Sequence, residues 1–177
     1  GLALPEAGAF ETPLGTVAVD TAMLGRIPQV RRSEAIHGSE HSLEVQLPFI
    51  QRVAPRAKLV PLVAGQAPPR QVADVLETLW GGAETVVIVS SDLSHYLPDR
   101  LGRAMDRETV RQILHLDTTL ATERACGAVP VAGFLEVARR LKLHPVLLDL
   151  RNSGDATGDL EEVVGYGAFA FFETGQP

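Results

Sequence analysis

One run of residues constrains the fold of this chain more than any other. Residues 85–89 read TVVIV, a β-branched and apolar stretch, and the polar sequence SSDLSH follows directly at residues 90–95. A strand that is apolar on both faces is typical of the interior of a covered sheet. Proteins of the α/β class bind ligands at the carboxyl ends of such strands. The run therefore predicts a buried central strand that ends in a functional loop.

Strand and helix signals alternate along the rest of the chain. Strands or hairpins are expected over residues 12–19, 58–64, 145–150 and 165–172, a loop over 31–39, and helices over 21–25, 41–53, 69–79, 99–116, 117–124 and 130–141. This alternation predicts an α/β fold with three α/β/α layers around a mostly buried central sheet. The length of 177 residues suits a single domain over residues 1–177.

Composition and charge argue against several classes of partner. The net charge is −6 and no run of Lys and Arg exceeds two residues, which argues against direct contact with nucleic acid or an anionic membrane. No apolar stretch approaches the roughly 20 residues that span a bilayer. The single cysteine cannot form an intramolecular disulfide, which fits a reducing compartment. We therefore expect a cytoplasmic protein.

The loop after the predicted strand holds Asp92 and His95, three residues apart. At this spacing the two side chains can share one side of a turn. A carboxylate beside an imidazole can fix its tautomer and raise its basicity, as acid/base catalysis requires. The alternative is that Asp92 caps a helix and His95 is a polar residue with satisfied hydrogen bonds. The local sequence favours neither interpretation.

A second pair, His41 and Glu44, lies in the sequence EHSLEVQLP at residues 40–48. In a helix these two side chains lie on one face, and Pro48 kinks the helix because its ring crowds the carbonyl of Glu44. Histidine and glutamate at this spacing can bind a metal or relay a proton. Without other information, the pattern favours a solvated helix start whose acidic residues interact with the helix dipole.

Cys126 comes just before another predicted helix, with Gly127 at a tight turn and Pro130 suited to the first helical turn. A cysteine in this place can serve as a metal ligand or a nucleophile, because the helix dipole favours its thiolate. A lone cysteine is, however, more often a small buried apolar residue. The sequence contains no common zinc, dinucleotide or P-loop motif.

In this order and at these spacings, the motifs resemble the Memo family, which in bacteria and archaea is component B of the AmmeMemoRadiSam system. The resemblance covers nearly the whole chain. The matching segments are Glu11-Thr12-Pro13-Leu14-Gly15-x-x-x-Val19-Asp20, Glu40-His41-Ser42-x-Glu44-x-Gln46-Leu47-Pro48-Phe49, Val89-Ser90-Ser91-Asp92-x-x-His95-Tyr96, Cys126-Gly127-x-x-Pro130, Asn152-Ser153-Gly154-Asp155 and Val164-Gly165-Tyr166.

The resemblance implies a fold like that of the LigB-type class III extradiol dioxygenases, which hold non-haem iron(II) in an open site. It implies that Cys126 is a metal ligand, that His95 beside Asp92 is the acid/base group, and that His41 and Glu44 line the pocket. The cofactor would be Fe(II) or Cu. A cysteine ligand departs from the usual two-histidine, one-carboxylate set, which argues against ordinary catechol cleavage and favours copper.

This chain resembles the C-terminal part of the family fold. The family's two histidine ligands come from N-terminal motifs, of the types Pro-His-Ala-Gly and Gly-Pro-Ser-His, that this sequence does not contain. The ligand set within the chain is therefore incomplete. A missing segment would also leave a sheet edge exposed, and formation of a homodimer would cover it.

Three functions follow from the resemblance. The first is a metal-dependent, dioxygenase-like oxidoreductase acting on a small molecule. The second is a non-catalytic adaptor that binds a peptide or protein in the same cleft, since a fold does not determine a function. The third is a partner role with the radical-SAM and AMMECR-type proteins of the same system.

Overall fold

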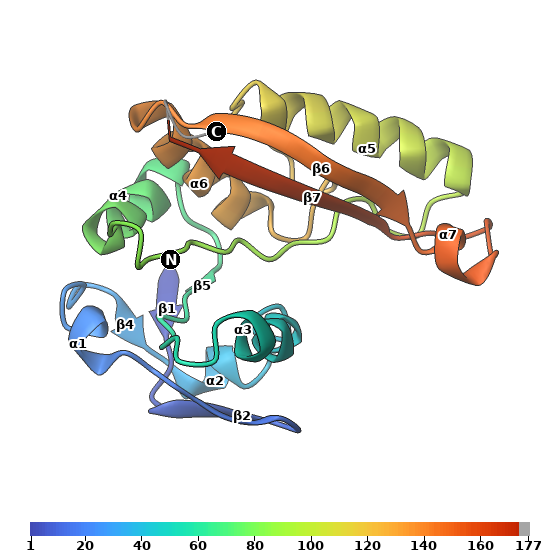
Figure 1. Ribbon diagram of the computed structural model, residues 1–177. Coiled ribbons are helices and arrows are strands. Elements are labelled where there is room, and N and C mark those ends of the chain that lie inside the picture. Colours follow the sequence, from blue (N-terminus) through green and yellow to red (C-terminus); the bar gives the residue numbers. More distant parts are fainter. Residues whose placement is uncertain (174–177) are drawn as a thin grey trace. The chain divides into compact units, whose positions relative to one another are not determined.

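The computed structural model describes residues 1–173 and is a mixed α/β structure with small sheets and helices (Figure 1). Contacts within the chain divide it into two compact units. The first unit contains residues 1–67 and 75–90, and the second contains residues 68–74 and the chain from Ser91 onward. The single domain expected from the length stays a prediction. Within residues 1–173, no helix has both the length and the apolar character needed to cross a membrane.

The first unit is built on a short, buried central strand. This strand, β1 (Leu2–Leu4), pairs in parallel with β4 (Arg31–Arg32) and antiparallel with β5 (Val63–Ala64). The helical elements are α1 (Thr21–Leu24), α2 (Glu34–His37), the 3-10 helix η1 (Glu44–Gln46) and α3 (Leu47–Val53). Helix α4 (Pro69–Leu79) has the bounds that its amphipathic pattern predicts.

A hairpin in the first unit confirms the strand signal at residues 12–19. Strands β2 (Ala9–Thr12) and β3 (Gly15–Ala18) pair antiparallel, with Thr12 opposite Gly15. Gly15 has φ +115°, a conformation that side chains other than glycine rarely adopt. The glycine therefore determines where the chain reverses.

The second unit contains a long antiparallel hairpin flanked by helices. Strand β6 (His144–Asn152) pairs with β7 (Gly165–Phe172) along its whole length, and helix α5 (Asp99–Leu114) packs alongside both strands (Figure 1). The remaining elements are helix α6 (Ala128–Arg140) and the short helix α7 (Gly154–Thr157). These bounds agree with the strands expected over 145–150 and 165–172 and with the helices expected over 99–116 and 130–141 to within a few residues at each end.

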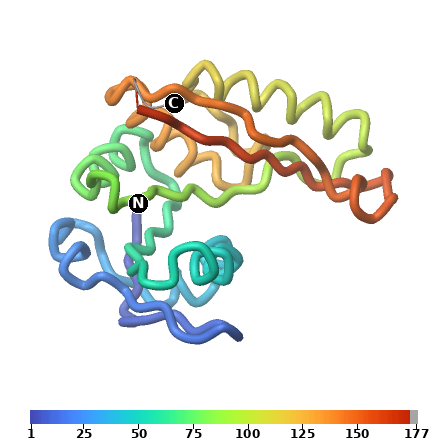
Figure 2. Tube along the Cα trace, in the orientation of Figure 1, coloured from blue at the N-terminus to red at the C-terminus, as the bar shows by residue number. Residues whose placement is uncertain are grey.

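The predicted central strand over residues 85–89 is wrong. After the turn that follows α4 the chain runs without helical coiling (Figure 2), but no strand is assigned over residues 85–92 and no partner strand pairs with them within residues 1–173. The side chains of Val86 and Ile88 are 80% and 52% exposed. β-propensity describes how well a residue fits a paired, covered surface, so it cannot produce a strand without a neighbour.

Other expectations are corrected at the edges of helices. The predicted loop over 31–39 contains β4 and α2, and the predicted helix over 117–124 is absent from the described chain. The helix expected over 41–53 starts as η1 at Glu44 and becomes α-helical at Leu47, so His41 precedes it. Pro48 lies in the first turn of α3, where its missing N–H costs nothing.

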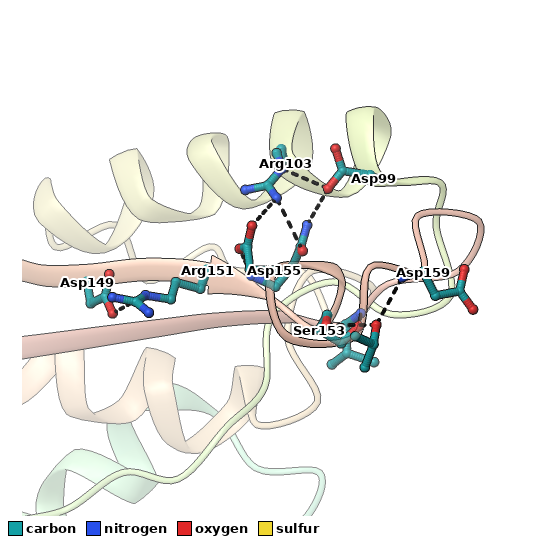
Figure 3. Close-up of polar contacts among 10 residues, drawn as sticks. Asp99, Arg103, Asp149, Arg151, Ser153, Asp155 and Asp159 are labelled. Atoms are coloured by element: carbon teal, nitrogen blue, oxygen red, sulfur yellow. Dashed lines mark hydrogen bonds and ion pairs between the residues drawn. The ribbon is translucent and has the colours of Figure 1, made fainter.

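An ion-pair network joins the start of α5 to the turn after β6 (Figure 3). Arg103 donates to Oδ1 of Asp99 at 2.7 Å and to Oδ1 of Asp155 at 2.6 Å. Asn152 donates through Nδ2 to Asp99 at 2.8 Å, and its backbone N–H donates to Oδ2 of Asp155 at 2.9 Å. Hydrogen bonding from Arg103, and then from the Asn152 N–H, holds the pKa of Asp155 below its ordinary value.

We expect Asp155→Asn to lower the melting temperature at pH 7. The pKa of Asp155 is lower in the folded than in the unfolded chain, so the pair stabilises the fold above the unfolded pKa. The difference from wild type should shrink as the pH falls from about 4 toward 2. Asp149→Asn is the matched control, because Asp149 pairs with Arg151 where both side chains are more than half exposed. Equal losses in the two variants at pH 7, or a difference unchanged at low pH, would contradict this account.

The core of the second unit includes an aromatic pair. Phe134 of α6 is 8% exposed and meets Phe171 of β7 edge to face, with ring centroids 4.8 Å apart. We expect Phe134→Ala to lower the free energy of unfolding by about 3–5 kcal/mol, because it leaves a cavity and removes the ring contact. Urea denaturation measures this loss. Phe172→Ala, at a position that is 36% exposed, should cost less than half as much; similar losses would count against this core.

Candidate metal site

The loop from Ser91 to Leu97 is attached by backbone hydrogen bonds to the residues that lead into β7. Leu93 N–H donates to the Gly165 carbonyl, and Gly165 N–H donates to the Ser94 carbonyl, both at 2.8 Å. Val163 N–H donates to the Leu97 carbonyl at 2.9 Å. From Ser94 to Leu97 the loop takes one residue more than the facing segment from Gly165 to Val163. The extra residue makes a β-bulge, a feature that often redirects a side chain beside an active site.

Three side chains that the sequence marks come together at this loop. Nε2 of His95 lies 3.5 Å from Oδ2 of Asp92. The sulfur of Cys126 joins them, and the three potential ligand atoms all lie within 4.8 Å of one another. The side chains of His95 and Asp92 are 30% and 47% exposed, and Cys126 is exposed. The group is therefore open to solvent and to an incoming ion.

Cys126 is held against the loop from the N-terminal end of α6. The Asp92 N–H donates to its sulfur at 3.2 Å, and the Ser91 hydroxyl lies 3.7 Å from the same atom. The Gly127 N–H donates to the Ser91 hydroxyl oxygen at 2.9 Å. These contacts join the turn before α6 to residues 91 and 92. They explain how a cysteine 34 residues away in sequence meets Asp92.

Asp106 supports the loop from the inside. It lies on α5, is 2% exposed, and accepts a hydrogen bond from the Ser94 N–H at 3.0 Å. Its carboxylate packs directly against Gly165, where a Cβ atom would overlap it. Sequence reasoning missed this residue. The available signal was a carboxylate on the helix face that also carries Gly102 and Thr109, both of which are buried.

The other two predicted site residues, His41 and Glu44, belong to the first unit. Both side chains are exposed, and only Glu44 is in a helical element. Their neighbour Glu40 accepts the N–H groups of His41 and Ser42, each at 2.8 Å. The Ser42 N–H is the largest cause of a lowered pKa at Glu40. A role for His41 and Glu44 in the metal site stays a prediction.

The chemistry of the three donors fits a metal ion. Ions bound at about 2.0–2.3 Å hold sulfur, nitrogen and oxygen ligands about 3.5 Å apart in tetrahedral geometry. The His95 and Asp92 atoms already have that separation, and the Cys126 sulfur lies within 4.8 Å of both. Thiolate and imidazole together suit iron, copper and zinc rather than magnesium or calcium. The arrangement can therefore hold a transition metal and leave positions open for another ligand.

We expect Asp106→Ala to cost about 1–3 kcal/mol of stability, because the buried Ser94 N–H loses its acceptor. The Ser94 amide should also exchange with solvent faster, as measured by hydrogen exchange. Asp106→Asn retains an oxygen acceptor and should keep most of the protection. Unchanged exchange in Asp106→Ala would show that Asp106 does not hold the loop.

Comparison with known proteins shows that the chain is similar to proteins of one family along most of its length. The family model described as Memo-like protein matches residues 1–170. A MEMO1 family protein from Methanothermobacter thermautotrophicus is 36% identical over 185 residues, covering 94% of this chain and 66% of the relative. A relative in Aquifex aeolicus is 35% identical over 89% of this chain and 65% of its own length. A relative in Archaeoglobus fulgidus is 34% identical over 97% of this chain and 72% of its own length. The chain thus spans about two thirds of the length of these curated relatives.

Proposed function

Because this chain belongs to the Memo family, we propose that it is a redox protein whose metal centre is built on Asp92, His95 and Cys126. The observation that carries the proposal is the convergence of three different ligand atoms within 4.8 Å. These side chains come from a bulged loop and from the start of a helix. Cys126 therefore meets the other two through the tertiary fold, because it lies 34 residues from Asp92 in the sequence.

Each of the three residues has a distinct part. Cys126 supplies the thiolate, which is the softest donor and the one that selects among metals. His95 presents Nε2, and Asp92 presents Oδ2, on the same side of the loop. With a metal bound, both atoms would serve as ligands beside the Cys126 sulfur, and further positions would stay open. Without a metal, the Asp92 carboxylate lies 3.5 Å from Nε2 of His95, a position from which a carboxylate can orient an imidazole.

Iron(II) and copper are the metals we propose, since both accept sulfur and imidazole ligands and both support electron transfer. A redox metal would supply one-electron chemistry toward a small molecule or dioxygen. The familiar iron site of dioxygenases uses two histidines and a carboxylate. Here Cys126 takes the place of one histidine, which argues against ordinary ring cleavage and favours copper.

Several finer features of the proposal rest on the family resemblance. They include a three-layer arrangement around a covered sheet, a pocket wall that contains His41 and Glu44, and further histidine ligands from segments that this chain does not contain. A cytoplasmic location, a homodimer, and radical-SAM and AMMECR-type partners belong to the same group.

The direct test is metal binding by protein purified without oxygen. Wild type should retain or take up iron or copper, measured by mass spectrometry and by titration. Cys126→Ser and His95→Ala should each weaken binding by more than about 10-fold, because each removes a ligand. His115→Ala is the matched control, since His115 is exposed at the C-terminal end of α5.

Two results would overturn the proposal. One is unchanged metal affinity in Cys126→Ser. The other is a wild-type protein that binds neither metal. In that case a peptide or protein ligand whose binding survives chelation would make the adaptor function the better account.

A further inference from the structure

Tyr96 has a left-handed backbone conformation in a place where non-glycine residues rarely adopt one. Among residues 1–173, three non-glycine residues have positive φ: Tyr96 at 54°, Leu116 at 54° and Lys142 at 56°. Leu116 and Lys142 each come directly after a helix C-cap, where left-handed residues are common. Tyr96 follows no helix. It lies inside the bulge, next to His95.

This conformation costs free energy at a bulky residue. Glycine adopts this left-handed conformation readily because it has no Cβ to collide with the backbone, whereas other residues rarely do. Hydrogen bonds on both sides hold Tyr96 in place, through the carbonyls of Ser94 and Leu97. Strain of this kind persists where the surrounding structure over-determines it, and it concentrates at functional sites.

Burial of the tyrosine side chain does not offset the cost. The residue is 73% exposed. The ring instead lies beside the His95 imidazole, with centroids 5.7 Å apart and planes tilted by 49°. This is within the range of favourable aromatic pairs. His95 is therefore flanked by the Asp92 carboxylate and by the Tyr96 ring.

We propose that Tyr96 is a positioning residue for His95: its ring limits the rotation of the imidazole and keeps Nε2 directed toward Asp92 and Cys126. The inference rests on the proposed metal centre for its consequence, but the ring contact itself does not depend on a metal. A glycine would suit the backbone better, yet it would release the imidazole. The tyrosine side chain therefore serves to position His95 and does not stabilise the fold.

The first experiment is NMR spectroscopy of the metal-free protein. Wild type should show nuclear Overhauser contacts between the Tyr96 and His95 rings. Tyr96→Phe keeps the ring and should leave the His95 ring resonances close to their wild-type positions. Tyr96→Asn tolerates the left-handed backbone without an aromatic ring, so it should shift and broaden them. The absence of a ring–ring contact in wild type would overturn the proposal, whatever the metal results are.

The second experiment is titration with cobalt(II), which reports sulfur and nitrogen ligands through its visible spectrum. Tyr96→Asn and Tyr96→Gly should bind cobalt about 10–100-fold more weakly than wild type, as expected for loss of a group that orients a ligand. Tyr96→Phe should bind within about twofold of wild type on the same reasoning. Lys142→Gly is the matched control for a left-handed residue replaced by glycine, and its cobalt affinity should not change.

Thermal melting separates positioning from stabilisation. Tyr96→Gly should melt no lower than wild type, because glycine suits the left-handed backbone. A lower melting temperature in Tyr96→Gly would mean that the tyrosine side chain stabilises the fold. A cobalt affinity in Tyr96→Asn equal to that of wild type would mean that Tyr96 does not position the metal ligand. If wild type binds no cobalt, the iron and copper titrations decide the metal proposal, and the NMR comparison alone then decides the role of Tyr96.

Discussion

Gly165 is the point on which the arrangement of the candidate site depends. It exchanges backbone hydrogen bonds with Leu93 and Ser94, both at 2.8 Å. Because glycine has no side chain, the buried carboxylate of Asp106 can lie against it and accept the Ser94 N–H. The ligand loop, strand β7 and helix α5 therefore meet at one contact. If a side chain at position 165 displaced Asp106, the loop would lose its internal support, and with it the placement of His95.

The elements that could be predicted from sequence are those whose signals are local. Helix α4 matches its amphipathic pattern, and β7 matches its apolar run, residue for residue. The run at residues 85–89 had the strongest strand composition, yet it forms no strand within the described chain. A strand exists only through a paired neighbour, and no strand pairs with this run within residues 1–173. The β-propensity of residues 85–89 therefore could not predict whether they pair in a sheet.

The same distinction separates the site residues that were predicted from those that were missed. Asp92, His95 and Cys126 come from motifs, and the structure brings them within 4.8 Å. Asp106 and Tyr96 act through contacts that no local pattern reveals: a buried hydrogen bond in one case and a left-handed backbone in the other. Chemistry-bearing residue types could thus be named in advance. The residues that hold them in place could be identified only from the three-dimensional structure.

The central claim is that Cys126 binds the metal as one of its first ligands. X-ray absorption spectroscopy on the iron- or copper-loaded protein tests this most directly. The account predicts one sulfur scatterer at about 2.3 Å together with nitrogen or oxygen scatterers at about 2.0 Å. The sulfur signal should be absent in Cys126→Ser. A coordination shell of nitrogen and oxygen alone in the wild-type protein would contradict the account and would place the metal elsewhere.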